Sequence, residues 1–173
     1  SVNGLLIEQE FEILKDPRFE TRSEEFAAQF DFLMKVRDKV SEANQGVIDI
    51  RKTKDDLTYL KNKIGADPKY KDIAESIKKF EDELTVIENN IHQTKNKSVQ
   101  DPLNYGIKIN NRLAHLMVEE AAGDFPPTKQ AEEVRVMLTK LVEDEMSKLK
   151  STINSNLSVI NKMAREKGVE MVF

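Results

Sequence analysis

The feature that most limits the fold of this chain is one long apolar pattern between residues 21 and 64. Apolar residues recur there at alternating intervals of three and four positions, and this spacing is typical of a coiled-coil seam. The seam consists of Leu33, Val36, Val40, Ala43, Val47, Ile50, Leu57 and Ile64. A single helix over this stretch would be roughly 65 Å long, far longer than a compact globule of this size needs. The pattern therefore predicts an elongated bundle of helices.

Capping residues predict where the first two helices begin and end. Thr21 and Glu24 fit a T-x-x-E capping box, in which a hydroxyl and a carboxylate bind free backbone N–H groups of the first turn. Gly65 predicts the end of this helix, and Asp67 followed by Pro68 predicts the start of the next one. The first helix is therefore expected to end before a short turn.

The rest of the chain divides into three more helical segments. The second helix is predicted over residues 67 to 97, the third over residues 101 to 123 and the fourth over residues 128 to 167. Thr128 is expected to cap the fourth helix at its start, and Gly168 has the position of a left-handed C-terminal cap.

Helix lengths predict how these segments are arranged. The second and third helices would be roughly 45 and 27 Å long, so only their sum matches the roughly 65 and 60 Å of the first and fourth. This favours an all-α, elongated up-and-down helical bundle of three layers in which the middle helix is broken. The alternative, a true four-helix bundle in which the chain reverses at residues 98 to 105, stays open.

Gly46, inside the first helix, is interpreted as tolerated rather than as a point of close approach.

A strand pattern precedes the helices at residues 5 to 14. Apolar residues alternate there with glutamates, which would place the two kinds on opposite faces of a strand. The apolar set is Leu5, Ile7, Phe11 and Ile13, and the acidic set is Glu8, Glu10 and Glu12. A lone strand has no hydrogen-bonding neighbour, so we expect it to be the last strand of a preceding sheet or a packed extension. In isolation it should pair with a second copy, giving a homodimer, or lie against the bundle.

Composition narrows the function classes. The net charge of −4 argues against a nucleic-acid partner, because phosphate binding depends on clustered lysines and arginines. The absence of cysteine excludes disulfides, thiolate metal sites and cysteine nucleophiles, but it does not identify a compartment. No apolar run has the length of a membrane span. Ser1 opens without a signal peptide, so the numbering is expected to begin inside a larger protein.

Candidate catalytic or metal-binding residues are few. His92 and His115 each lie four residues from a glutamate, Glu88 and Glu119 respectively. A di-iron bundle instead uses Glu-x-x-His at three-residue spacing, and that motif is missing from this sequence. Pairs exposed on a helix surface are therefore the favoured interpretation. We expect no catalytic residue, metal or cofactor in this chain, although a metal- or cofactor-binding helical-bundle enzyme remains the alternative.

One polar stretch is not explained by the apolar periodicity, and it is the candidate structural motif of the chain. It consists of Gln100, Asp101, Pro102, Leu103, Asn104 and Tyr105. Asp101 is expected to cap the third helix, while Asn104 and Tyr105 bond carbonyl groups left free at the end of the second helix. In this hypothesis Tyr105 is a buried anchor of the helix junction. A ligand-binding motif would instead leave Tyr105 exposed.

Two runs of sequence carry a resemblance to a known family. These are LKDPRFETRSEEFAAQF and KNKSVQDPLNYGIKINNRLAHL, at residues 14 to 30 and 95 to 116. They resemble the C-terminal region of bacterial BNR-repeat proteins, whose β-propeller is similar to the sortilin ectodomain and which are often labelled glycosyl hydrolases. The Q-D-P-L-N-Y match is its most specific part. Gly106 departs from the family, whose members often carry a proline there.

The resemblance implies a domain order and a function. In that family a propeller is followed by an immunoglobulin-like sandwich and then by a helical region. Residues 1 to 20 would then be the end of the sandwich and residues 21 to 173 the helical bundle. The resemblance implies an exported protein, periplasmic or at the cell surface, whose hydrolase activity would belong to the propeller. This chain would be a non-catalytic accessory or protein-interaction module whose partners are its own propeller and sandwich, or another protein.

Overall fold

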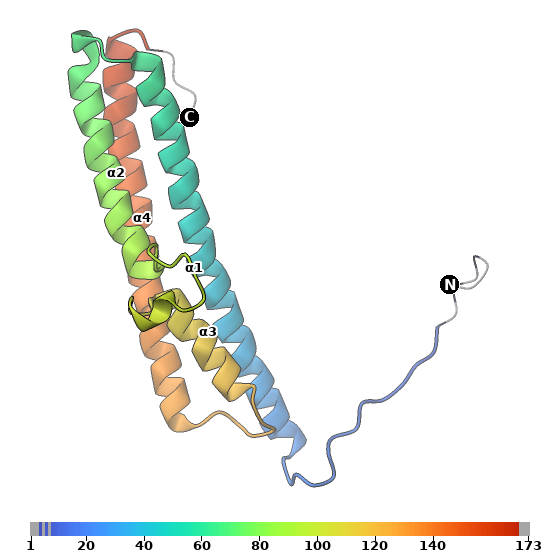
Figure 1. Cartoon of the computed structure of the whole chain (residues 1–173). Coiled ribbons are helices and arrows are strands. Elements are labelled where there is room, and N and C mark those ends of the chain that lie inside the picture. Colours follow the sequence, from blue (N-terminus) through green and yellow to red (C-terminus); the bar gives the residue numbers. More distant parts are fainter. Residues whose placement is uncertain (1–3, 5, 7, 170–173) are drawn as a thin grey trace.

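The computed structural model describes residues 4, 6 and 8 to 169, and every regular element among them is helical (Figure 1). The elements are α1 (Ser23–Ile64), the 3-10 turn η1 (Pro68–Tyr70), α2 (Lys71–Ile91), the 3-10 turn η2 (Asp101–Leu103), α3 (Ile109–Glu120) and α4 (Lys129–Glu166). None of the described helices has the length and hydropathy needed to cross a membrane.

The chain makes three passes along one elongated bundle (Figure 1). Helix α1 spans the whole length, α2 and α3 return in succession along it, and α4 spans the length again. Hydrogen bonds fix this order, because Asn110 at the start of α3 meets Asn44 in the middle of α1 at 3.1 Å. At the end of α3, the Glu120 carbonyl accepts a bond of 2.7 Å from Gln29, near the start of α1. The predicted three-layer bundle with a broken middle helix is confirmed, and the chain does not reverse between α2 and α3.

The predicted seam forms the core. In α1, Val36, Ala43, Ile50 and Leu57 are fully buried, and Leu33 and Val40 pack partly buried against them. The apolar face of α2 is buried along its whole length, and α4 completes the core on the third side. The coiled-coil spacing was therefore a correct guide to which side of α1 faces inward.

The predicted caps are confirmed at four of six positions. Thr128 accepts a bond of 3.0 Å from the backbone of Ala131, and Asp67 accepts one of 2.9 Å from that of Lys69. Glycines with positive φ follow the last residues of α1 and α4: Gly65 at 60° and Gly168 at 71°. A side chain is strained in this region of φ, which explains why glycine ends both helices.

The predicted capping box of α1 is wrong by one residue. Glu25, not Glu24, receives the free N–H group, from the backbone of Arg22 at 2.8 Å. The hydroxyl of Thr21 instead donates to the carbonyl of Asp124, in the loop between α3 and α4. Thr21 is taken up by a tertiary contact and cannot cap its own helix.

Gly46 is a point of close approach, so the interpretation of a merely tolerated glycine is wrong. Gly46 is buried on α1, and a Cβ atom there would lie only 2.6 Å from the Cε atom of Met146 on α4. Met146 occupies the space that a side chain would need, which lets the two long helices approach each other.

Residues 8 to 14, which we name the acidic arm, form no strand. Their apolar side chains are exposed, with Phe11 at 83% and Ile13 at 85%, so the arm does not lie against the bundle (Figure 1). The strand prediction is therefore not confirmed for these residues, since a strand needs a neighbour to pair its backbone. Leu5 and Ile7 of the predicted strand lie outside the described residues.

Candidate functional site

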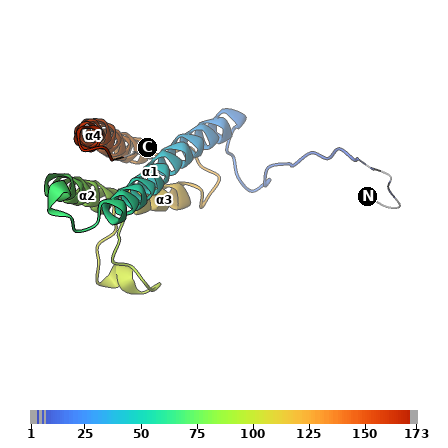
Figure 2. The same ribbon diagram turned by 90° about the horizontal axis from the view of Figure 1, so that it is seen from above.

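The candidate site is the segment between α2 and α3, residues 92 to 108, which we name the junction loop. It projects sideways from the bundle at the break in the middle layer (Figure 2). The predicted second helix ends at Ile91 rather than near residue 97, and the predicted third helix begins at Ile109 rather than at residue 101. Between these ends the chain has one 3-10 turn, η2, and leaves apolar side chains in water: Val99 is 96% exposed and Leu103 88%.

Asp101 holds the tip of the junction loop together. Its carboxylate accepts bonds from the backbone N–H groups of Lys97 and Ser98 and from the Ser98 hydroxyl, the last two at 2.8 and 2.9 Å. These bonds, led by that from Lys97, lower the pKa of the Asp101 carboxyl below its usual value. The prediction that Asp101 caps α3 is wrong, because the carboxylate is satisfied within its own loop. Pro102 follows as part of η2, as its fixed φ allows.

Gln93 closes the base of the junction loop. Its side chain is buried, its Nε2 atom donates a bond of 2.8 Å to the carbonyl of Gly106, and its Oε1 atom accepts one of 3.3 Å from the backbone of Lys95. This single side chain joins the segment that leaves the bundle to the segment that returns to it. The loop is therefore anchored at its base by Gln93 and at its tip by Asp101.

Asn110 clamps the junction from the α3 side. Its Nδ2 atom donates to Asn44 of α1 and also lies 3.2 Å from the Nδ1 atom of His92, which accepts in the tautomer that carries its proton on Nε2. Its Oδ1 atom accepts from the backbone of Asn111 at 2.8 Å. The sequence analysis did not predict the roles of Gln93 and Asn110. Burial of Asn110 could have been predicted, because it lies three residues before Leu113 and so on the same helix face as that core residue.

Tyr105 is not the buried anchor that the sequence suggested. Its ring is 38% exposed, and its hydroxyl has no hydrogen-bond partner among residues 8 to 169. The ring instead faces the Lys95 ammonium, whose Nζ atom lies 5.5 Å from the ring centroid. Gln100, Pro102 and Asn104 are exposed as well. The motif at residues 100 to 105 thus lies at the surface of the loop, the placement expected for a binding motif.

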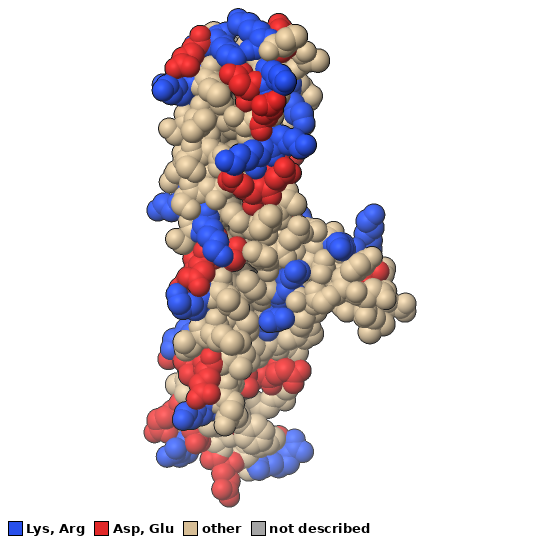
Figure 3. Space-filling view, turned by 90° about the vertical axis from the view of Figure 1, so that its left-hand side faces the viewer, with Lys and Arg blue, Asp and Glu red and all other residues tan. Residues whose placement is uncertain are grey.

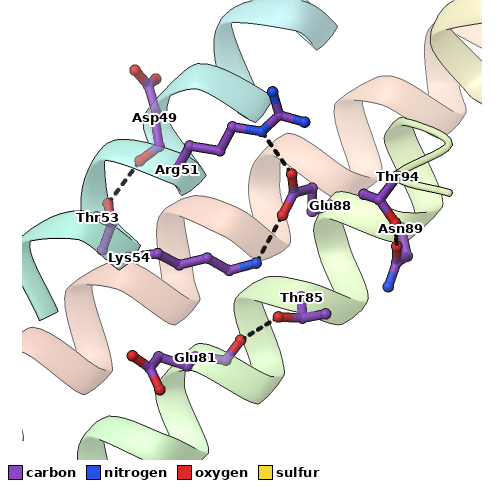
Figure 4. A network of polar contacts seen from close by, with 9 residues as sticks. All are labelled: Asp49, Arg51, Thr53, Lys54, Glu81, Thr85, Glu88, Asn89 and Thr94. Atoms are coloured by element: carbon purple, nitrogen blue, oxygen red, sulfur yellow. Dashed lines mark hydrogen bonds and ion pairs between the residues drawn. The ribbon is translucent and has the colours of Figure 1, made fainter. Parts of the chain in front are cut away.

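Glu88, one of the candidate metal-binding glutamates, is held by two cations of α1 (Figure 4). Its buried carboxylate accepts bonds from the Nε atom of Arg51 at 2.9 Å and from the Nζ atom of Lys54 at 2.7 Å. Burial alone raises the pKa of the Glu88 carboxyl, but the bonds from Lys54 and Arg51 outweigh it and hold the pKa below its usual value. Glu88 therefore joins α2 to α1, while His92 points to Asn110.

The second candidate pair, His115 and Glu119, lies on the exposed face of α3. Within the described part of the chain, no three histidine, aspartate or glutamate side chains are grouped so that they could hold a metal ion. What the junction loop can do chemically is present apolar and cationic groups on a fixed backbone. No family model, no curated protein and no solved structure matches this chain.

Proposed function

We propose that this chain is a non-catalytic protein-interaction module that binds its partner through the junction loop. The observation that carries the proposal is the exposure of Val99 and Leu103 on a loop whose backbone is held by hydrogen bonds. Apolar side chains gain roughly 25 cal/mol for each Å² that a partner removes from water. These two side chains are not buried in the bundle, so the free energy of burying them can contribute to the binding of a partner.

The hydrogen bonds of the loop favour binding as well. A loop that must be ordered by its partner loses part of the binding free energy to that ordering. Here Asp101 and Gln93 already hold the backbone at the tip and at the base. The backbone that carries the apolar side chains is thus held in place before any partner binds.

We place this module in an exported protein on the strength of the sequence resemblance alone. In that arrangement the bundle follows a BNR-repeat propeller and a sandwich domain, and the partners are those domains or a separate protein. Any hydrolase activity would belong to the propeller. Glycoside hydrolysis normally needs two carboxylates on either side of a sugar. We therefore expect the purified chain to leave glycosides intact, and turnover by a contaminant-free sample would contradict the proposal.

Site-specific photocrosslinking in the cells that produce the protein tests the proposal. A photoreactive amino acid at position 103 should yield one discrete crosslinked protein, and the same probe at the exposed position 151 on α4 should not. Adding Val99→Ser should reduce the crosslink while the melting temperature stays unchanged. No crosslink at position 103, or a fall in melting temperature with Val99→Ser, would contradict a binding role for the loop.

A further inference from the structure

The acidic arm carries charges that have no partner among the residues that the structure describes. Glu8, Glu10 and Glu12 are exposed and form no ion pair with any residue that the structure describes. Phe11 and Ile13 alternate with them and are exposed as well. The arm therefore combines three exposed carboxylates with exposed apolar side chains.

The junction loop and the first turn of α3 have the opposite character. Lys95, Lys97, Lys108 and Arg112 make no ion pair with the described residues, and Asp101 is the single acidic residue between positions 92 and 112. This local excess of positive charge occurs in a chain whose net charge is −4. Figure 3 shows the loop as a protrusion that is mostly uncharged, with lysine and arginine near its base.

The two segments are complementary in both charge and hydrophobicity. We propose that the acidic arm of one copy of this chain binds the junction loop of a second copy, so that two copies exchange arms in a symmetric dimer. The carboxylates of the arm then face Lys95, Lys97 and Lys108, and its apolar side chains cover Val99 and Leu103. This inference rests on the proposed protein-binding role of the loop and names the loop's partner.

The direction of the arm favours a second copy over the same chain. Figures 1 and 2 show the arm leaving the lower end of the bundle toward a different side from the loop. To reach its own loop, the arm would have to swing in against the bundle and pass around it to the side that carries the loop. A two-fold symmetric dimer leaves the arm pointing outward and forms the same contact twice.

Charge also argues against pairing of the two arms with each other, which is the homodimer expected from the strand pattern alone. All three glutamates lie at even positions, so they would share one face of a strand. In an antiparallel pair centred on Glu10, each glutamate would oppose a glutamate of the other copy, and like charges in that position are destabilising. The junction loop offers the opposite charge instead.

Charge reversal on each side tests the exchange. The arm variant is Glu8→Lys, Glu10→Lys and Glu12→Lys. The loop variant is Lys95→Glu, Lys97→Glu and Lys108→Glu. A charge-matched control reverses three exposed lysines elsewhere: Lys52→Glu, Lys150→Glu and Lys162→Glu. Circular dichroism checks that all of them keep the helical fold of the wild type.

Sedimentation equilibrium over a range of concentrations measures the result. The wild type should dimerise, the arm and loop variants alone should dimerise at least tenfold more weakly, and the control should match the wild type. An equimolar mixture of the arm and loop variants should recover the wild-type affinity, because both contacts of the mixed dimer then join opposite charges. Dimerisation of the wild type should also weaken as NaCl rises from about 50 to about 500 mM.

A monomeric wild type, a dimer that ignores both reversals, or a mixture that stays monomeric would each overturn the arm exchange. The proposed function fails separately. If position 103 crosslinks to a different protein while the wild type stays monomeric, the loop is a binding site and only its assigned partner is wrong. If position 103 crosslinks to nothing and the wild type is monomeric, both proposals fall.

Discussion

The two halves of the middle layer hold to the bundle by different means. Helix α2 buries six large apolar side chains in 21 residues: Ile73, Ile77, Phe80, Leu84, Ile87 and Ile91. Helix α3 has 12 residues and buries Leu113 and Asn110. The α2 half is therefore held mainly by apolar packing, and the α3 half depends much more on directional polar contacts.

Hydrogen bonds made by side-chain amides secure both ends of α3. At its start Asn110 bonds Asn44, and at its end Gln29 donates to the carbonyls of Glu120 and Gly123. Thr21 adds a bond to the next loop. A short helix buries too little apolar surface to fix its position in the bundle. Hydrogen bonds, which form in only one geometry, fix the position of α3 instead.

The largest effect should come from matched leucine substitutions in the two halves. Leu84→Ala in α2 removes a fully buried side chain and should lower the free energy of unfolding by about 4 kcal/mol. Leu116→Ala in α3 removes a partly buried one and should cost about half as much, because water already reaches the site. Chemical denaturation monitored by circular dichroism measures both. Equal losses would remove the distinction between the halves.

The next effect should come from Glu88, the main charged contact between α1 and α2. Glu88→Gln keeps the size of the side chain but weakens the bonds from Arg51 and Lys54, and should cost about 2 kcal/mol at neutral pH. Because the folded pKa of Glu88 is lowered, the unfolded chain binds the proton first. The stabilisation is therefore present above the usual value of 4.5 and is lost as the pH falls through the folded pKa.

The pH dependence supplies the control for Glu88. The difference in unfolding free energy between the wild type and Glu88→Gln should be largest near pH 7 and should shrink below about pH 4.5. A difference that is the same at both pH values would show that the charge of Glu88 does not contribute to stability.

A smaller effect is expected at Asn110, in the polar half. Asn110→Ala should cost about 1.5 kcal/mol, because the bond to Asn44 is lost and the Asn44 amide is left without its partner. Asn44→Ala and the double substitution complete a double-mutant cycle, which should give a coupling of at least about 0.5 kcal/mol. Additive losses would mean that the two amides stabilise the junction independently.

The smallest effect should be that of Tyr105→Ala. Its ring is partly exposed and its main recorded contact is with Lys95, so the loss should stay below about 1 kcal/mol. A loss of about 3 kcal/mol or more, as expected for a buried and bonded tyrosine, would restore this residue as the anchor of the junction. Thermal melting of the variant beside Lys108→Ala decides between the two.

The long helices were predictable because their signals are local and repeated. The spacing of Val36, Ala43 and Ile50 recurs over many turns, so one misjudged residue cannot change the assignment. The caps at Asp67 and Thr128 bind backbone groups two or three residues away, and sequence proximity alone brings these groups together. Similarly, the sum of the lengths of two short helices was enough to predict three passes of the chain.

The junction could not be predicted in the same way, because its contacts join residues that are distant in the sequence. Gln93 bonds Gly106 across 13 positions, and Asn110 bonds Asn44 across 66. Asp101 and Thr21 look like helix caps in the sequence, yet each is bound elsewhere in the fold. Polar side chains have several partners of similar energy within reach of the local chain, whereas apolar ones share one interior.

The amino-acid sequence by itself determined that this protein is an elongated bundle of long helices and which face of α1 is buried. Burial of an apolar stripe is non-directional, so its period alone is sufficient to specify it. Only the tertiary structure decided that the break in the middle layer extends from residue 92 to residue 108 and that Tyr105 and Leu103 face water. It also decided which side-chain amides form hydrogen bonds at the junction, because such a bond forms only when packing has placed a donor and an acceptor at the right distance and angle.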